Sequence, residues 1–265
     1  MKRGVYRAVR KNGEVYYKAS VTYREKHISL ASYHTEEEAH RAYLEARNLL
    51  ASRSPVSDYD IEHRALPFDK WVILVNFRDN GIYSATPVYL SKTYFLYYLS
   101  PSEYLIFDNE ELFYYSSRRI MKRGNRLFVA DYGAQVGILT RYGIRPHAVE
   151  GRDYRFKNGN RYDLRASNIE LINEYFGVQA VTKDGVQLYE ASIHVNGYSR
   201  IGFYKTPEEA AVAYNKAADM LMKKGIGRKY SLNYIESLKA SVYAKLYSET
   251  EIPESVFTAF KNMQE

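Results

Sequence analysis

The sequence predicts an α+β fold made of small units rather than one large domain. Three observations lead to this expectation. A pattern of strands and a helix occurs twice, the residues between the copies alternate short apolar runs with turn signals, and two amphipathic patterns close the chain. At 265 residues the chain has room for two or three domains of roughly 50 to 100 residues.

An internal repeat relates residues 4–50 to residues 177–219, which align with two single-residue gaps. The matched positions are Gly4 with Gly177, Ala19-Ser20 with Ala191-Ser192, Tyr33 with Tyr204, Thr35 with Thr206, Ala39 with Ala210, and Tyr43 with Tyr214. We therefore expect both segments to fold in the same way.

Each copy is expected to contain three short strands. In the second strand of copy one, Ala19 and Val21 alternate with polar residues, and Ile193 and Val195 do the same in copy two. This alternation predicts one apolar and one polar face. The hairpin-turn dipeptides are Asn12-Gly13, Asp184-Gly185 and Asn196-Gly197.

A helix is expected to follow the strands in each copy. Thr35 with Glu38, and Thr206 with Glu209, form capping boxes, and Pro207 stands at the first helical position. An alanine-rich apolar stripe then predicts a helix that lies close to its sheet.

The remaining residues are expected to form less regular elements. Residues 51–66 are interpreted as a polar linker with a short turn or helix near Asp58. Residues 71–144, beginning with the apolar run WVILVNF, are expected to be mostly β structure with one or two short helices. Residues 231–247 and 253–263 predict two amphipathic helices, which either pack on the second copy or mediate dimerisation.

Composition restricts the chemistry. The chain has no cysteine, which excludes disulfides, thiol nucleophiles and thiolate metal sites. It has no apolar run of transmembrane length and no signal peptide, so we expect a cytoplasmic protein and no membrane partner. The net charge is +7, and residues 118–165 carry twelve Lys or Arg against four acids. This concentration of charge favours an anionic partner.

The repeat resembles the Apetala/ethylene-response-factor type of DNA-binding domain, which also occurs in mobile-element nucleases. In that family a three-stranded sheet lies in the major groove and its polar face touches bases and phosphates. The resemblance implies double-stranded DNA as the partner. By strand position the implied contacts are Arg3, Tyr6, Arg10, Lys18, Ser20 and Thr22 in copy one, and Gln179, Lys183, Glu190, Ser192, His194 and Arg200 in copy two. Copy two has few arginines on this face, which implies a lower affinity for DNA or a different partner.

Residues 156–169, FKNGNRYDLRASNI, resemble the His-Asn-His nuclease motif of homing endonucleases that bear such DNA-binding domains. The frame, Asn158-Gly159-Asn160 through Asp163, Arg165 and Ser167-Asn168, fits without a gap and predicts a turn and a helix. The chemical positions differ from the family. Phe156 replaces the general base, Arg155 a metal ligand, Leu164 a structural asparagine and Thr140 an upstream histidine.

These replacements predict a catalytically inactive core with no metal and no cofactor. Arg155, Lys157, Arg161 and Arg165 are instead expected to form a phosphate-binding surface. A shifted metal site using His147, Glu150 and Asp153 is the alternative, although these residues are more typical of a loop.

The expected domains are a first DNA-binding module at 1–52, a degenerate nuclease-like domain with a ββα core at 67–174, a second module at 175–235 and C-terminal helices at 236–265. The leading hypothesis is a non-catalytic, sequence-specific duplex-DNA-binding protein. It would derive from a homing endonuclease, associate with DNA, and act as a transcriptional regulator, repressor or site blocker. The alternatives are a nuclease with a relocated catalytic set, and a phage or mobile-element inhibitor that binds a protein or a protein–nucleic-acid complex.

Overall fold

The chain folds into two compact units. The structure is a computed structural model and describes residues 1–146, 148–195, 197–225 and 230–261. One unit contains Met1–Ile138 and Asn158–Asn168, and the other contains Leu139–Lys157 and Ile169–Glu265. Small antiparallel sheets and helices make up both, which confirms the α+β class. The boundary passes through the segment 67–174, which was expected to form one domain.

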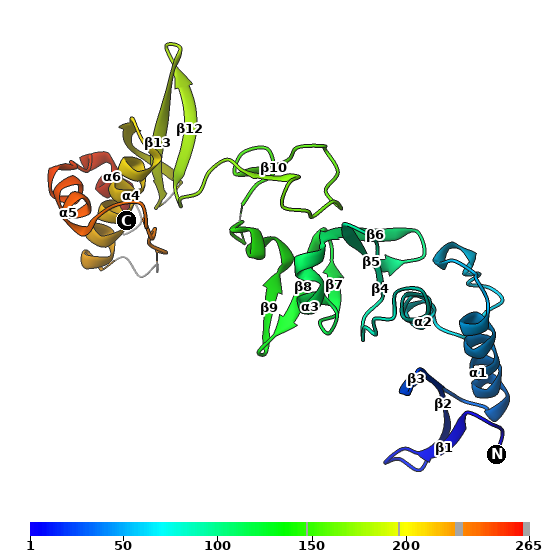
Figure 1. Ribbon diagram of the computed structural model, residues 1–265. Coiled ribbons are helices and arrows are strands. Elements are labelled where there is room, and N and C mark those ends of the chain that lie inside the picture. The colour runs from blue at the N-terminus through cyan, green and yellow to red at the C-terminus, as the bar shows by residue number, and fades with distance from the viewer. Residues whose placement is uncertain (147, 196, 226–229, 262–265) are drawn as a thin grey trace. The chain divides into compact units, whose positions relative to one another are not determined.

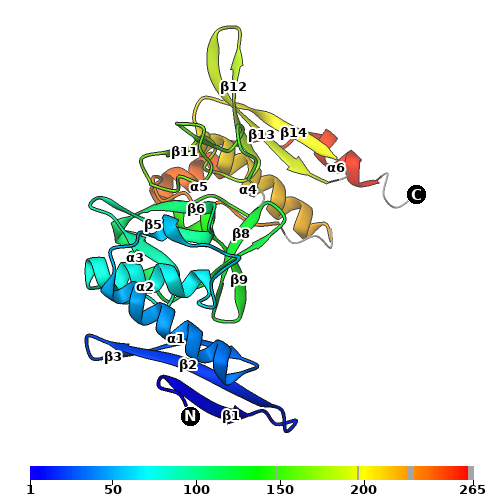
Figure 2. The same ribbon diagram turned by 90° about the vertical axis from the view of Figure 1, so that its right-hand side faces the viewer.

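The first module begins the first unit (Figure 1). Its antiparallel sheet has the order β1-β2-β3. The elements are β1 (Val5–Val9), β2 (Val15–Tyr23), β3 (Lys26–Tyr33) and α1 (Glu36–Ala51). Thr35 and Glu38 form the expected capping box. Figure 2 shows α1 lying across the sheet, and its buried alanines, such as Ala39 and Ala46, allow the close approach.

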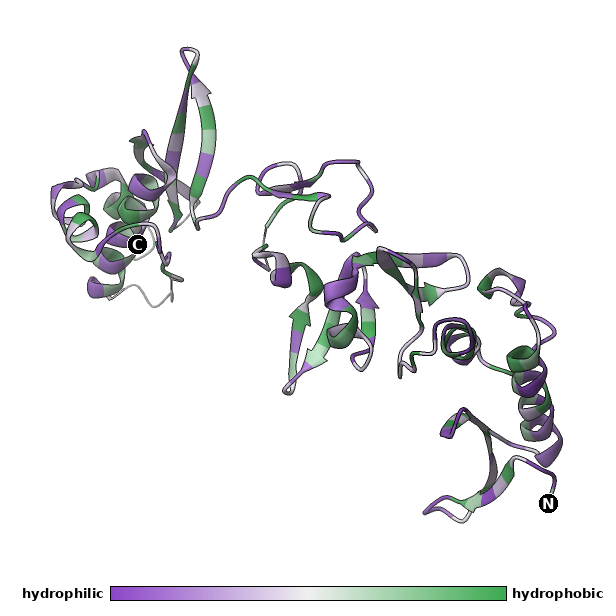
Figure 3. Cartoon of the chain, viewed as in Figure 1, coloured by the Kyte–Doolittle hydropathy of each residue, from purple (hydrophilic) through white to green (hydrophobic). Residues whose placement is uncertain are grey.

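The second module repeats this arrangement within the second unit. Its elements are β12 (Val178–Lys183), β13 (Val186–His194), β14 (Tyr198–Tyr204) and α4 (Pro207–Lys223), with the sheet order β12-β13-β14. Both modules have a β-bulge at the matched Ala-Ser pair of the middle strand. In Figure 3, α1 and α4 both carry green hydrophobic and purple hydrophilic residues, as helices buried on one side do.

The glycine before each module is required by packing. Gly4 and Gly177 have φ of 78° and 66°, a region that side chains rarely adopt. A Cβ atom on Gly4 would lie 2.1 Å from the ring of Tyr43, and one on Gly177 would lie 2.3 Å from the ring of Tyr214. The repeated Gly and Tyr therefore form one interlocked corner in each module.

Between the first module and residue 153, the chain forms one long helix, short helices and two small sheets. The helices are η1 (Val56–Asp58), α2 (Phe68–Asn80), η2 (Asn109–Glu111), α3 (Leu112–Tyr115) and η3 (Ile138–Tyr142). The sheets are β4 (Val88–Leu90), β5 (Tyr94–Ser100) and β6 (Glu103–Asp108), and β7 (Ile120–Arg123), β8 (Arg126–Asp131) and β9 (Ala134–Gly137).

The run WVILVNF, expected among the β segments, is the centre of α2. All residues of this run are buried, so its sequence lacks the polar face that normally marks a helix. Pro67 precedes the helix and Gly81 ends it with a left-handed cap. Trp71 and Leu74 join Leu49 of α1 in one core.

The nuclease-like segment forms the hairpin β10 (Tyr154–Phe156) and β11 (Ile169–Leu171), with Asn158-Gly159-Asn160 in the connecting turn. The helix expected in the frame of this motif is absent from described residues 148–176. That prediction was wrong, because the side chains of Asn158, Asp163 and Asn168 bind the loop backbone and hold it in turns. After β11, only a short stretch precedes β12.

The C-terminal helices α5 (Ala240–Glu249) and α6 (Glu254–Lys261) confirm the two amphipathic patterns, although the first helix begins nine residues later than expected. α5 contacts α4, and Val256 of α6 is fully buried in the core of the second module. Both helices therefore pack on that module. Among the described residues, no helix is both long and apolar enough to cross a membrane.

Candidate nucleic-acid interface

The outer face of each module is the side of its sheet turned away from the helix. In the first module, a row of paired residues crosses this face as Tyr6, Lys18 and Ser32. Lys18 is exposed and lies 5.7 Å from the ring centre of Tyr16. The guanidinium of Arg10 lies 5.5 Å from the centre of the same ring. The ring of Tyr16 therefore contacts two cationic side chains.

Charge is segregated between the two sides of the first module. Residues 1–34, which form the sheet, contain eight Lys or Arg and two acids. Residues 35–52, which form α1, contain four acids and two Arg. The outer face is therefore the positive side, and an anionic partner would approach it rather than the helix.

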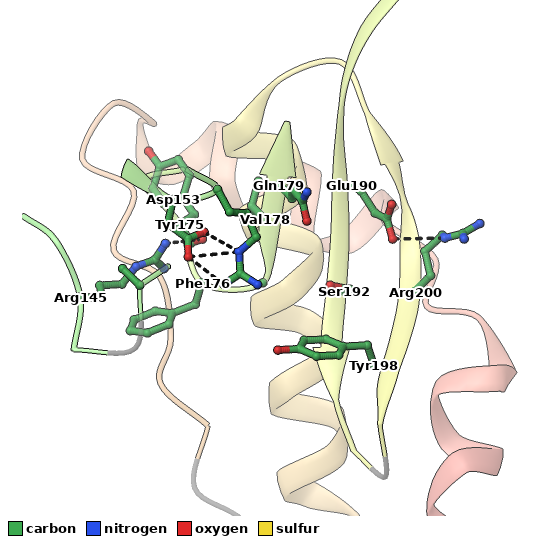
Figure 4. A pocket seen from close by; sticks show the side chains of 13 residues that line it. Arg145, Asp153, Tyr175, Phe176, Val178, Gln179, Glu190, Ser192, Tyr198 and Arg200 are labelled. Carbon is green, nitrogen blue, oxygen red and sulfur yellow. Dashed lines mark hydrogen bonds and ion pairs between the residues drawn. The ribbon is translucent and has the colours of Figure 1, made fainter. Parts of the chain in front are cut away.

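The equivalent row in the second module consists of Gln179, Glu190 and Phe203. Glu190 accepts a hydrogen bond of 3.3 Å from Nε of Arg200, as Figure 4 shows. Arg200 and Lys183 lie 5.1 and 5.0 Å from the ring centre of Phe203. Residues 177–205 contain three Lys or Arg and two acids, so this face is nearly neutral.

The structure places most of the predicted contact residues on these two faces. The exposed ones are Arg3, Tyr6, Arg10, Lys18, Thr22, Gln179, Lys183, His194 and Arg200, and the half-buried ones are Glu190 and Ser192. Ser20 differs, because the bulge leaves it only 7% exposed. Its backbone N–H donates to the carbonyl oxygen of Gly4 at 3.0 Å, which gives this position a structural role.

The four predicted phosphate-binding residues of the nuclease-like segment are divided between the two units. Arg155 and Lys157 belong to one unit, and Arg161 and Arg165 to the other. Arg155 makes a two-point ion pair with Glu170, with distances of 2.9 and 3.1 Å. Its charge is thus largely compensated within the hairpin.

Asp163 is the centre of a hydrogen-bond network in the connecting loop. It accepts from Nε and Nη2 of Arg165 at 2.8 and 2.7 Å, and from Nδ2 of Asn158 at 2.9 Å. The bonds from Arg165 hold the pKa of this carboxyl below its ordinary value. Asn168 accepts from the backbone of Asn158 and donates to the carbonyl of Asp163. The frame of the motif therefore has a structural role that does not depend on catalysis.

Two of the four replaced positions, Phe156 and Leu164, are apolar and buried. Phe156 is 8% exposed and packs edge-on against Tyr154, while Leu164 is 1% exposed. Neither side chain can accept a proton. Among the described residues, no group of three or more His, Asp or Glu side chains could hold a metal ion.

The alternative site of His147, Glu150 and Asp153 is only partly observable, because His147 lies outside the described residues. Asp153 is buried and bonded to Arg152, to the backbone of Val149 and to Asn173. These bonds fix the loop before β10 and give Asp153 a structural role.

The predicted contact set did not include Arg145, Arg152 and Arg47, which line two hollows. One hollow, of about 580 Å³, lies beside the outer face of the second module, and the other, of about 520 Å³, lies in the first module. Two of these arginines, Arg145 and Arg152, belong to the basic segment 118–165. They lie close to the second module only in the folded chain, and local sequence patterns do not predict such a long-range contact.

Comparisons with protein-family models, with curated proteins and with solved structures found no match to this chain.

Proposed function

We propose that this protein binds double-stranded DNA through the outer face of the first module and does not cleave it. The observation that carries the proposal is the segregation of charge between the sheet and the helix of that module. Phosphate contacts by Lys and Arg dominate DNA affinity, and the major groove of B-DNA admits β structure. A basic sheet with an acidic helix behind it suits this mode of docking.

Side chains on the outer face provide chemistry for both affinity and sequence selection. Lys18 and Arg10 can contact phosphates or guanine edges, while Tyr6, 54% exposed, offers a hydroxyl and an apolar ring. In the second module, Gln179 suits adenine, and the carboxylate of Glu190 suits the amino group of cytosine. Two linked modules would bind an extended site more tightly than either alone.

The absence of cleavage is proposed from the replaced chemical positions. Phe156 is buried where the resemblance places a general base, and Arg155, paired with Glu170, replaces a metal ligand. A protein that recognises a site without cutting it can act as a transcriptional regulator, a repressor or a blocker of that site. Descent from a homing endonuclease would explain the retained frame.

The test is binding of the full chain to mixed-sequence duplex DNA over a range of salt concentrations, followed by selection and sequencing of bound duplexes. We expect salt-sensitive binding, one enriched sequence, and intact DNA with or without Mg²⁺. Lys18→Glu should weaken binding, whereas Arg41→Glu, which removes an equal charge from α1, serves as the matched control. Equal effects of the two substitutions would remove the first module's outer face from the interface.

Two other results would support the competing functions. Mg²⁺-dependent cleavage that is lost on Glu150→Gln would indicate a nuclease with a relocated catalytic set. No binding to duplex DNA even at low salt would favour a protein partner or an inhibitor role. The nearly neutral outer face of the second module, with Tyr198 78% exposed, is the feature that favours this second candidate.

A further inference from the structure

Both modules have a hollow at the same corner of the fold, where the glycine before the first strand meets the bulge in the middle strand. Gly4, Tyr6 and Ser20 line the hollow of the first module. Their repeat partners Gly177, Gln179 and Ser192 line the hollow of the second. The corner is closed in the same way in both, because Ser20 and Ser192 donate their backbone N–H groups to the carbonyl oxygens of Gly4 and Gly177.

The cations of the two hollows come from different parts of the sequence. Arg3 and Arg47, both from the first module itself, line the first hollow, and its described lining has no Asp or Glu. In the second hollow, Arg145 and Arg152 come from the segment before β10, which belongs to the same compact unit. A segment outside the repeat thus supplies cations where the second module has few of its own.

Arg145 carries a positive charge that its hydrogen bonds do not neutralise. Its Nη2 donates to the backbone carbonyl oxygens of Asn173 and Tyr175 at 3.0 and 2.7 Å. Its Nη1 is buried and makes no hydrogen bond within the described residues. The guanidinium lies 4.3 Å from the ring centre of Phe176, beside which it appears in Figure 4. A charge removed from water in this way acts more strongly on a nearby anion than an exposed one.

Arg152 is the more accessible cation of the hollow. Its side chain is 42% exposed and makes an ion pair of 2.7 Å with Asp153, which lines the hollow together with Glu190. This pair fixes the position of the guanidinium and compensates part of its charge. Because Asp153 also binds the backbone of Val149 and the side chain of Asn173, the arginine is attached to a rigid loop. A fixed guanidinium loses less conformational freedom when it binds a phosphate than a mobile one does.

We infer that the second-module hollow binds a backbone phosphate of duplex DNA, with Arg152 in direct contact and the buried guanidinium of Arg145 behind it. This inference rests on the proposed function and extends it. The second module would use its outer face, with Gln179 and Glu190, for bases, and the segment before β10 for the backbone. The matching hollow with Arg3 and Arg47 would hold a phosphate at the equivalent place in the first module.

The test measures the salt dependence of duplex binding for the full chain and for Arg152→Gln. Each phosphate contact contributes about 0.9 to the slope of log affinity against log salt concentration. We expect Arg152→Gln to lower the slope by about this amount and to weaken binding about tenfold. Arg126→Gln, which removes an equal charge from the first residue of β8, is the matched control and should change the slope less.

Three further measurements separate a specific contact with the DNA backbone from loss of structure and from binding of free phosphate. Arg152→Lys should retain the slope, because it keeps the charge, whereas a variant disrupted in its fold would not. Single phosphates of the bound duplex can be replaced with neutral methylphosphonates. At one position, this replacement should weaken DNA binding by the parent chain but not by Arg152→Gln. Sodium phosphate should compete no better than sodium chloride at equal ionic strength, since the site requires the DNA backbone.

The outcomes distinguish the inference from the proposed function. If the parent chain binds DNA but Arg152→Gln and Arg126→Gln behave alike, the hollow is not a phosphate site and the DNA-binding function remains. If sodium phosphate competes specifically, the site takes free phosphate and the inference is overturned. If the parent chain does not bind duplex DNA at all, the proposed function fails first.

Discussion

Lys18 and Glu190 occupy equivalent positions in the two modules, each in the middle of a row of three residues across the outer face. Lys18 lies between Tyr6 and Ser32, and Glu190 between Gln179 and Phe203. The same backbone position therefore presents opposite charges. Two copies of one fold can thus divide affinity and selectivity between them, because phosphate binding needs cations while base recognition also uses acceptors.

Exchanging these charges should change the DNA affinity in opposite directions. Glu190→Lys replaces a carboxylate of the outer face with a cation and releases Arg200 from its ion pair, so we expect tighter non-specific binding with a steeper salt dependence. Lys18→Glu should produce the reverse. Fluorescence anisotropy titrations of a mixed-sequence duplex at several salt concentrations measure both effects. An unchanged slope for Glu190→Lys would place the outer face of the second module outside the interface.

Substitution of Gly4 should destabilise the first module much more than substitution of another glycine with positive φ. In Gly4→Ala the new Cβ would lie 2.1 Å from the ring of Tyr43, in addition to the strain at a φ of 78°. Gly13 has a φ of 86° but nothing within 4 Å, so Gly13→Ala tests strain alone. We expect a cost of about 1 kcal/mol for Gly13→Ala and at least about 3 kcal/mol for Gly4→Ala, measured by urea unfolding. Similar midpoints for the two variants would mean that Tyr43 moves away at little cost.

The loop network predicts an acid-sensitive contribution to stability from Asp163. Its pKa is lowered in the folded chain, mainly by the hydrogen bonds from Arg165. Its contribution is therefore complete above the unfolded pKa of 3.8 and is lost as pH falls through the folded value. Asp163→Asn should cost about 1–3 kcal/mol near neutral pH. The difference from the parent chain should shrink in acid. Urea unfolding at a series of pH values measures it, and a difference that does not depend on pH would contradict the ion pair.

Local signals were sufficient to predict the modules. The repeated strands and the capping boxes were predictable because they depend on residues close in sequence. Hairpin dipeptides such as Asn12-Gly13 fixed the strand ends for the same reason. Both C-terminal helices also followed from their periodicity. The bulge at the Ala-Ser pair and the contact of Gly4 with Tyr43 were not predicted.

Other features depend on long-range contacts and could not be predicted in the same way. All residues of the run 71–77 are buried, so the sequence shows no alternation of apolar and polar residues there. Without that alternation, a helix cannot be distinguished from a strand by its periodicity. The helix expected in the nuclease-like frame does not occur in described residues 148–176, because side chains of Asn and Asp bind the loop backbone. Arg145 and Arg152 line a hollow with Glu190, far along the chain, and local pattern does not show that proximity.

The packing of the C-terminal helix α5 on α4 should become less stable at high pH. Tyr247 donates a hydrogen bond of 2.7 Å to Asp219, and burial together with this bond raises its pKa from 10.0 to about 12. Because the folded value is the higher one, its contribution to stability is complete below the unfolded pKa of 10.0 and is lost as pH rises toward about 12. Tyr247→Phe should therefore cost about 1 kcal/mol near neutral pH and progressively less above pH 10. Ultraviolet difference titration against this variant isolates one tyrosine among the 28 of the chain. A transition at the ordinary tyrosine pKa would show that the bond to Asp219 does not persist in solution.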